Sequence, residues 1–207
     1  MIGPAPDPAD PEELLARARA GDNAALGALL ELYRNYLTLL ARLQIGRRLQ
    51  GKVDDADLVQ ETFLNAHRDF SAFRGITEGE FMAWLRQILA ARLAQLVRRY
   101  LGTQQRDVRL ERNLAGELDR SSAALGHALP APHSSPSQRA ARREQAVLLA
   151  DALGRLSGDY REVIILRYLE GLPLADVAQR MGRSVDSVKK LWTRGLVQLR
   201  RALGDTA

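Results

Sequence analysis

The sequence predicts an all-α protein in which two small helical domains are joined by a flexible linker. Three observations lead to this fold class. Ala, Leu and Arg dominate, while aromatic residues make up only 5% of the 207 residues, and such straight-chain side chains favour helices. Apolar residues recur at three- and four-residue steps in several stretches. A Pro- and Ser-rich stretch around Pro130–Pro136 interrupts this pattern, which is typical of a linker.

Composition narrows the classes of function. The formal net charge is +5 and the sequence pI about 9.9, so a polyanion such as nucleic acid is a suitable partner. The absence of cysteine excludes disulfides, thiolate catalysis and Cys-ligated zinc. No apolar run approaches the roughly 18–20 residues that cross a bilayer, and the acidic, Pro-rich start does not resemble a secretory signal. We therefore expect a cytoplasmic protein with no metal, cofactor or membrane partner.

The first domain is predicted to be a four-helix bundle over residues 12–101, after an N-terminal tail over residues 1–11. Its first helix begins near Pro11 and ends at Gly21, and Asp22 or Asn23 can cap the second. The second helix is expected to end near Gly46. Its apolar stripe is Leu26, Leu29, Leu30, Tyr33, Leu37, Leu40 and Leu43.

The third helix is predicted to run from Asp54 or Asp55 to about Phe70, and the fourth from about Glu80 to Leu101. A loop with two glycines, over residues 73–79, separates them. The expected inner stripe of the third helix is Leu58, Val59, Thr62, Phe63 and Ala66. The fourth helix offers for burial Phe81, Trp84, Leu85, Ile88, Leu89, Leu96 and Val97.

The linker is assigned to residues 102–143, although 106–118 are compatible with a helix. The second domain, residues 144–207, is predicted to open with a helix that ends near Leu156. The next helix spans residues 159–170 and ends at Gly171. Its run of β-branched residues at 163–165 also suits a strand, but the spacing of the apolar residues favours a buried helix.

Residues 174–191 have the spacing of a DNA-binding helix-turn-helix. Ala178 is small where the two helices approach, Gly182 suits the turn, and Ser184 can cap the second helix. The expected inward residues are Val177, Met181, Val188, Leu191 and Trp192. The polar and basic side chains left outside suit a major groove, and the predicted DNA-binding set is Ser184, Asp186, Ser187, Lys189, Lys190, Thr193 and Arg194. The alternative is a helical hairpin with a solvated basic face, and Arg183 stands where an apolar residue is more usual.

The run from Asp54 to Phe63, read as D-x-x-D-L-V-Q-E-T-F, resembles extracytoplasmic-function (ECF) sigma factors of bacterial RNA polymerase. In that family this acidic helix docks on the coiled coil of the polymerase β′ subunit. The resemblance therefore implies a polymerase-binding set that consists of Asp54, Asp57, Leu58, Gln60 and Glu61. Without the resemblance, the acidic pair Asp57 and Glu61 would be interpreted as a solvated helix face.

The resemblance continues through Phe73-Arg74-Gly75 and through Phe81-x-x-Trp84-Leu85-Arg86, which look like the loop and helix that open and read the promoter −10 element. It implies that the −10 DNA-binding residues are Phe73, Arg74, Arg86, Arg92, Arg98 and Arg99. The alternative for the aromatic residues is ordinary core packing. The chain has Ala90-Ala91 where the family often has Arg-Asn. Its L-R-Q-I-L-A and K-K-L-W segments (85–90 and 189–192) resemble a planctomycete-type subgroup.

The resemblance implies a sigma factor that binds core RNA polymerase and directs transcription initiation through the −10 and −35 elements. The first domain would be sigma region 2, and the second would be sigma region 4, which also touches the β flap. Promoter DNA and core polymerase are the implied partners, and an anti-sigma factor is a further candidate. Two other classes remain open. An enzyme would have to use His67, His127 or His133, which no nucleophile or phosphate loop accompanies. A stand-alone helix-turn-helix regulator would normally dimerise.

Overall fold

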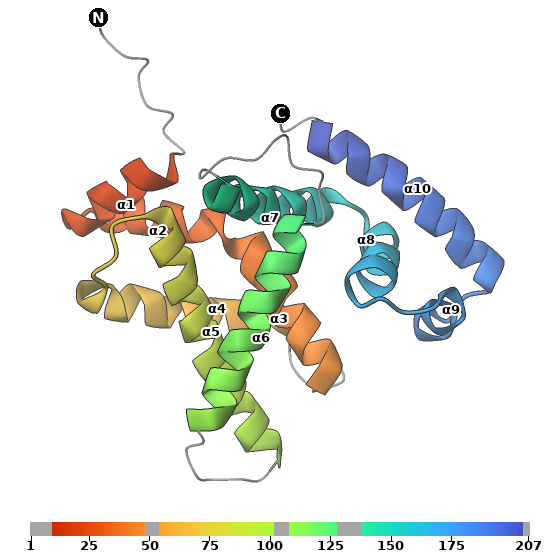
Figure 1. Cartoon of the computed structure of the whole chain (residues 1–207), viewed down its shortest axis with the longest axis horizontal. Coiled ribbons are helices and arrows are strands. Elements are labelled where there is room, and N and C mark those ends of the chain that lie inside the picture. The colour runs from red at the N-terminus through yellow and green to blue at the C-terminus, as the bar shows by residue number, and fades with distance from the viewer. Residues whose placement is uncertain (1–9, 49–53, 102–107, 128–137, 205–207) are drawn as a thin grey trace, which may run out of the picture. The chain divides into compact units, whose positions relative to one another are not determined.

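The computed structural model describes residues 10–48, 54–101, 108–127 and 138–204, and all regular elements in these ranges are helical (Figure 1). The predicted all-α class is therefore confirmed. The described residues fall into two units that divide between Ser122 and Ala123. Within the described ranges no helix is both long enough and apolar enough to cross a membrane.

The first unit is built from α1 to α5 and the part of α6 up to Ser122, with a short 3₁₀ helix, η1, after α4. Their bounds are α1 Pro11–Arg19, α2 Asn23–Leu32, α3 Arg34–Arg48, α4 Asp55–Asp69, η1 Phe70–Ala72, α5 Glu78–Leu101 and α6 Val108–His127. Three of the helices begin at an aspartate whose carboxylate accepts a backbone N–H of the first turn: Asp10 from Glu12 (2.9 Å), Asp22 from Ala25 (3.0 Å) and Asp54 from Ala56 (2.9 Å). These caps satisfy amides that have no partner inside the helix.

The single helix expected across residues 26–43 is two helices, because the chain turns at Tyr33. The Tyr33 N–H donates to the carbonyl of Leu30 in a three-residue turn (3.1 Å). The Tyr33 ring is buried 5.8 Å from the Phe81 ring, and its hydroxyl donates to the Glu78 carboxylate (2.9 Å). Tertiary packing of the tyrosine thus sets a corner that the unbroken apolar stripe does not reveal.

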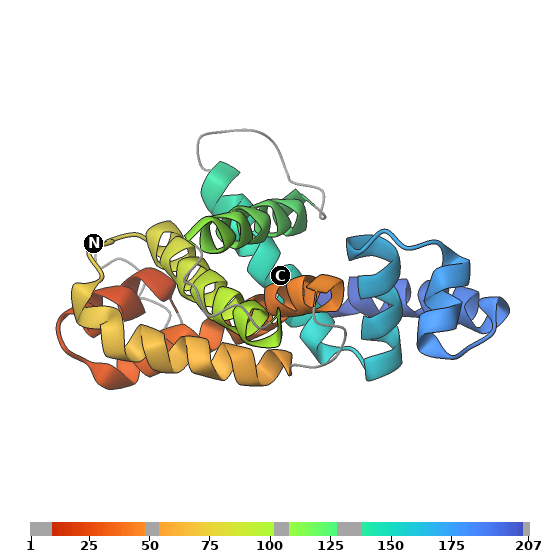
Figure 2. The same cartoon turned by 90° about the horizontal axis from the view of Figure 1, so that it is seen from below.

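The interpretation of residues 102–143 as a linker is wrong for α6, which packs on the first unit. Leu114 and Leu118 are fully buried, and the Tyr36 hydroxyl donates to Ser122 Oγ (2.7 Å). Figure 2 shows α6 on the side of α5 away from α4. Leu110, Leu114 and Leu118 recur every four residues, which indicates a helix, but this spacing does not show which part of the protein covers it. The Pro-rich part of the predicted linker lies outside the described residues, so the tether remains a prediction.

Truncating Leu118 to Ala should destabilise the first unit, because it leaves a cavity between α6 and the bundle. We expect a loss of about 2–4 kcal/mol in the free energy of unfolding. Urea titration followed by Trp84 fluorescence in a Trp192→Phe background reports on the first unit. Val108→Ala, at an exposed position of the same helix, is the control. Equal midpoints for the two variants would show that α6 does not contribute to this core.

The second unit contains α7 to α10 and a π-helical segment, η2. Their bounds are α7 Gln138–Arg155, α8 Gly158–Ile164, η2 Ile165–Leu169, α9 Leu174–Met181 and α10 Val185–Gly204. The β-branched run at 163–165 is helical and buried, as predicted, and Gly171 ends it with φ +72°. The Arg161 guanidinium donates to the carbonyls of Leu153, Gly154 and Leu156 at the end of α7, where the last carbonyls of a helix lack i+4 partners.

Candidate promoter and polymerase interfaces

Residues of α9 and α10 form the helix-turn-helix that the spacing predicts. Gly182 adopts the left-handed conformation, with φ 62° and ψ 35°, and Ser184 Oγ accepts the N–H of Ser187 (3.2 Å) at the start of α10. Val177 and Val188 are fully buried between the helices. Met181, Leu191 and Trp192 are only half-buried, so the interhelix core is smaller than expected.

Two contacts that the sequence did not indicate fix this motif to α8. The Arg183 guanidinium pairs with the Asp159 carboxylate (2.7 Å), which explains a basic residue in the turn. Gly195 lies where α10 crosses α8, and a Cβ at this position would stand only 3.3 Å from Ile164 Cδ1. A glycine inside a helix lowers its stability. At position 195 the close packing of α10 on α8 explains why a residue without a side chain is present.

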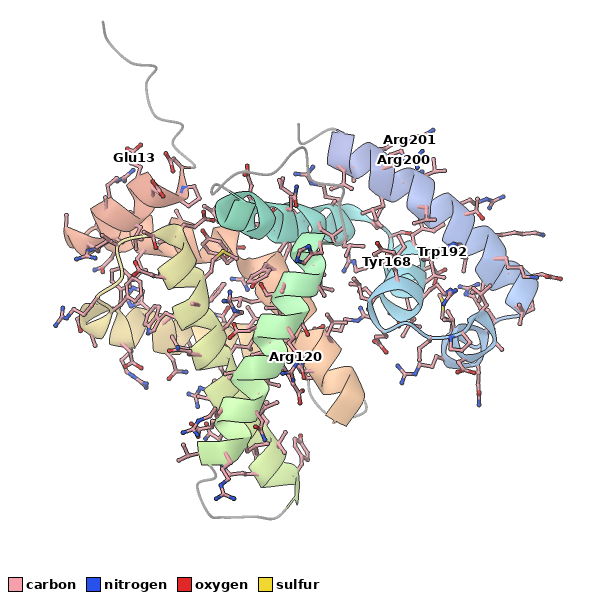
Figure 3. The ribbon with its side chains drawn as sticks, viewed as in Figure 1. Glu13, Arg120, Tyr168, Trp192, Arg200 and Arg201 are labelled. Atoms are coloured by element: carbon pink, nitrogen blue, oxygen red, sulfur yellow. The ribbon has the colours of Figure 1, made fainter. Side chains whose placement is uncertain are left out.

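The predicted DNA-binding side chains of α10 lie on the surface. Asp186, Lys189, Lys190, Thr193 and Arg194 are exposed, and Ser184 and Ser187 line the start of the helix. Lys189 Nζ lies 3.6 Å from the Asp186 carboxylate, a loose surface pair. Arg200 and Arg201 continue the basic character to the C-terminal end of α10 (Figure 3). A solvent-exposed basic face on the second helix of the motif is the arrangement that enters a major groove.

The acidic residues of α4 lie on one exposed face. Asp57, Gln60 and Glu61 are exposed at positions three and four residues apart. Leu58 is 1% exposed and belongs to the core, so its assignment to a polymerase surface is wrong. Leu64, which sequence reasoning missed, is 63% exposed one turn beyond Gln60 and Glu61. The sequence does contain a signal for this residue, because Leu64 is a large apolar side chain that does not belong to the predicted inner stripe of the helix.

The loop between η1 and α5 rests on a cluster of aromatic rings. The Phe73 ring centroid lies 4.9 Å from that of Trp84, 5.7 Å from that of Phe81 and 5.9 Å from that of Phe70. Phe81 is fully buried, while Phe73 and Trp84 are half-buried. The core interpretation of Phe81 therefore holds, and Phe73 anchors the loop from inside the cluster rather than standing free.

Two of the four α5 arginines assigned to DNA have protein partners instead. The Arg86 side chain is only 13% exposed, pairs with Asp119 of α6 (2.7 Å) and donates to the Tyr36 hydroxyl (3.1 Å). Burial raises the pKa of the Tyr36 hydroxyl, so it remains protonated as it accepts this bond and donates to Ser122. Arg98 pairs with Glu111 of α6 (3.3 Å). Because residues 108–127 were interpreted as linker, Asp119 and Glu111 were not expected as partners of these arginines.

The other two α5 arginines are more accessible. Arg99 is exposed near the end of the helix, and Arg92 is half-exposed beside Gln95, to which it donates. Ala90, at the first position where the family often has Arg-Asn, is buried, while Ala91 is exposed. The cationic surface of α5 is therefore smaller than the sequence suggested.

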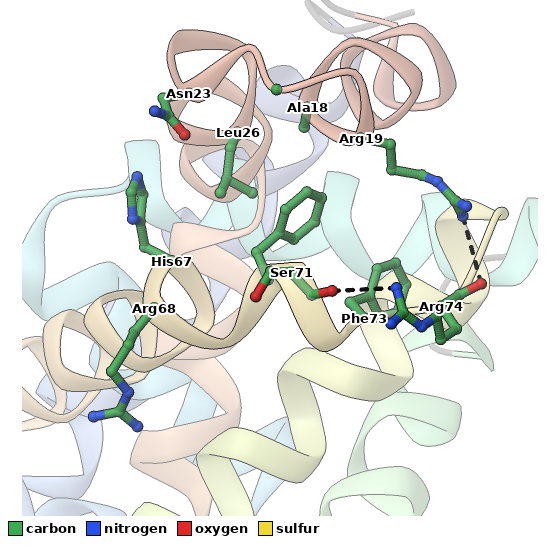
Figure 4. A pocket seen from close by; sticks show the side chains of 11 residues that line it. Ala18, Arg19, Asn23, Leu26, His67, Arg68, Ser71, Phe73 and Arg74 are labelled. Carbon is green, nitrogen blue, oxygen red and sulfur yellow. Dashed lines mark hydrogen bonds between the residues drawn. The ribbon is translucent and has the colours of Figure 1, made fainter.

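A pocket of about 340 Å³ opens between the α1–α2 turn, the end of α4 and the following loop (Figure 4). Its aromatic lining is Phe70 and Phe73, and its basic lining is Arg19, His67, Arg68 and Arg74. The Arg74 guanidinium donates to the carbonyl of Ser71 (3.2 Å). Aromatic faces beside cationic groups suit nucleic-acid bases and phosphates.

Comparison with known proteins agrees with this architecture. Residues 146–199 match the family model described as Sigma-70, region 4. RNA polymerase sigma factor NccH of Alcaligenes xylosoxydans xylosoxydans is 31% identical over 193 residues, which cover 93% of this chain and 94% of NccH. ECF RNA polymerase sigma factor BldN of Streptomyces coelicolor is 31% identical over 94% of this chain, which spans 66% of BldN. ECF RNA polymerase sigma-E factor of Haemophilus influenzae is 29% identical over 86% of this chain and 87% of that protein.

Two solved structures also match. The RsbN–BldN complex is 29% identical, covers 90% of this chain and 97% of the matched chain, and gives a TM-score of 0.31. CnrH in complex with the cytosolic domain of CnrY is 26% identical, and the match covers 96% of this chain and 99% of the matched chain. Its TM-score is 0.33. At such TM-scores the superpositions carry no argument, and the sequence relationship stands by itself.

A region 4 helix-turn-helix in a chain that aligns with nearly all of a sigma factor defines the class: this is a sigma factor of bacterial RNA polymerase. Within that class, the chain belongs to the ECF RNA polymerase sigma factors. It is accordingly a transcription initiation factor that directs RNA polymerase to promoters, and sigma factors are not enzymes. The alternative interpretation as a stand-alone helix-turn-helix regulator is therefore wrong.

Proposed function

We propose that the two units divide promoter recognition between them, with the first unit at the −10 element and the second at the −35 element. The exposed basic face of α10 carries the second half of this proposal, because its side chains are free to reach a groove while Val177 and Val188 hold the motif together. The loop over residues 73–77, with exposed Arg74 and Ile76, is the candidate −10 reader.

The proposed docking surface for the β′ coiled coil is the exposed face of α4. Its carboxylates, Asp57 and Glu61, would meet basic side chains of the partner, and the exposed Leu64 would add apolar contact at the same face. Asp54 caps α4, so its role would be to hold the start of that helix. The second unit would in turn touch the β flap, and Tyr168 is the most exposed large apolar side chain among its described residues (Figure 3).

We further propose that a second protein can restrain this sigma factor. BldN and CnrH, both similar to this chain, have each been solved in a complex, with RsbN and with the cytosolic domain of CnrY. An anti-sigma factor that covers the surfaces proposed above would prevent polymerase binding. Placement in a planctomycete-type subgroup is proposed on the L-R-Q-I-L-A and K-K-L-W segments alone.

Reconstituted transcription tests the proposed function as a whole. The purified chain and core RNA polymerase should together select promoters from a library randomised at both elements. We expect the chain to co-elute with core polymerase as a single copy, and the selected promoters to share two sequence blocks at a constant spacing. A chain that bound DNA tightly as a dimer without polymerase, and left transcription unchanged, would contradict the proposal.

A further inference from the structure

The loop over residues 73–77 forms neither helix nor strand, yet side chains from outside it hold its backbone. Arg19, at the end of α1, lies 55 positions before Arg74 in the sequence. Its Nη1 donates to the carbonyl oxygen of Arg74 (3.4 Å; Figure 4) and also to that of Gly75. A guanidinium has several donors in a fixed plane, so one arginine can hold two successive carbonyls.

Glu80 holds the other end of the loop. Its carboxylate accepts the N–H groups of Ile76 (2.9 Å) and Thr77 (3.0 Å) and the Thr77 hydroxyl (3.0 Å). In return, Thr77 Oγ1 accepts the N–H of Glu80 (3.3 Å), which completes a reciprocal helix cap. The bond from the Ile76 N–H, followed by those from Thr77, lowers the pKa of Glu80, so the carboxylate is charged at neutral pH.

Gly75 leaves no room for the loop to shift toward the aromatic cluster. A Cβ at this position would lie 2.3 Å from Phe73 Cζ and 2.8 Å from Glu80 Cβ. Phe73 itself is fixed by ring contacts with Phe70, Phe81 and Trp84. The loop backbone is therefore packed on one side and hydrogen-bonded at both ends.

These contacts fix the backbone but leave the side chains of the loop tip exposed. Ile76 is 72% exposed and Arg74 is exposed beside it. An exposed apolar residue and a cation on a fixed backbone form a preformed contact surface. Preformed surfaces bind better because less conformational entropy is lost on binding.

We propose that Arg19 is a positioning residue for promoter opening, which acts by holding the loop at residues 73–77 in the conformation that meets the −10 element. Arg19 acts through the loop carbonyls and not through contact with the reacting base pairs. The inference rests on the proposed −10 role of the loop. It assigns a function in DNA opening to α1, a helix to which neither the acidic motif nor the helix-turn-helix points.

The test compares Arg19→Ala with Arg17→Ala in the holoenzyme. Arg17 lies on the same helix but pairs with Asp22 (2.8 Å) instead of with the loop, so it is a matched control. The DNA probe is a promoter that the parental holoenzyme selects from a library, with 2-aminopurine at the −10 element to report opening. We expect Arg19→Ala to slow opening about tenfold, with partial recovery in Arg19→Lys and no change in Arg17→Ala.

Three further measurements separate positioning from a merely structural role. Affinity for core polymerase and the thermal midpoint should remain at parental values in Arg19→Ala, while hydrogen exchange at the Ile76 and Thr77 amides should accelerate. Gly75→Ala should displace the loop from its other side and slow opening in the same way. Parental opening rates in Arg19→Ala, or a loss that merely follows lower polymerase affinity or a lower thermal midpoint, would overturn the proposal.

The same experiment distinguishes failure of the proposed −10 role. Arg74→Ala and Ile76→Ser remove the exposed side chains of the loop without touching Arg19. If these variants slow opening but Arg19→Ala does not, the loop reads DNA and only the positioning role is lost. If both loop variants open the promoter at the parental rate, the loop does not read the −10 element, and the positioning proposal is overturned with it.

Discussion

Replacing both Asp57 and Glu61 with Lys should weaken binding to core RNA polymerase by more than about 100-fold, because like charges then oppose each other across the interface. Both side chains are exposed on one face of α4 and are not part of the core. Sedimentation velocity or co-elution with core polymerase measures the loss. The neutral pair Asp57→Asn and Glu61→Gln keeps the shapes and removes only the charge, so we expect an intermediate loss of about tenfold.

The matched control is the double change Glu12→Lys and Glu31→Lys, which alters the net charge equally within the first unit. Glu31 forms a surface pair with Arg34 (2.7 Å), and Glu12 is exposed in the first turn of α1. Such exposed positions contribute little to stability. Parental affinity for polymerase in the Asp57 and Glu61 variant, or an equal loss in the control, would show that α4 is not the docking helix.

Leu64→Ser tests whether the same face also binds through apolar contact. Leu64 is exposed on α4, so the change should leave the thermal midpoint unaltered. A weaker affinity for polymerase would extend the docking surface by one helical turn beyond the acidic pair. Leu58→Ala should instead lower the thermal midpoint, because this side chain is buried.

Features set by neighbouring residues were predictable from the sequence, and those set by distant packing were not. The αL turn at Gly182, the Ser184 cap and the Asp22 cap depend on residues within one helical turn, and their sequence signals are specific. The corner at Tyr33 depends on contacts with Phe81 and Glu78, far along the chain. Periodicity reports which side of a helix is apolar, but not where packing bends it.

In the candidate sites, too, the residues whose surroundings depend on distant packing were the ones predicted wrongly or missed. Arg86 was assigned to DNA because it follows Trp84-Leu85 in the family motif, yet Asp119 and Tyr36 hold it inside the first unit. A family motif also carries no information on side-chain direction, which explains why the buried Leu58 appeared among polymerase-binding residues. Arg19 holds the loop at residues 73–77 only through the fold, since its partners Arg74 and Gly75 lie more than 50 residues further along the chain.

The second large effect is expected from α10, where three basic residues should behave in two different ways. Val188 and Gly195 face the core, so at 3.6 residues per turn Lys190 lies near the centre of the outward face, and Lys189 and Arg194 lie on its flanks. A central side chain points at the groove floor, while flanking side chains point toward the phosphate backbones.

Lys190→Ala should therefore cost about 1–3 kcal/mol and relax the preference at one −35 position. Lys189→Ala and Arg194→Ala should weaken all promoters alike and reduce the salt dependence by about one counterion each. Arg201→Ala, in the last turn of α10 and about three turns after Lys190, serves as the control. Transcription from promoters with randomised −35 sequences, repeated at several salt concentrations, measures both quantities. Parental output, preference and salt response in all three variants would exclude α10 as the −35 reader, whereas a lost preference in Arg194→Ala alone would move the base contact one turn along the helix.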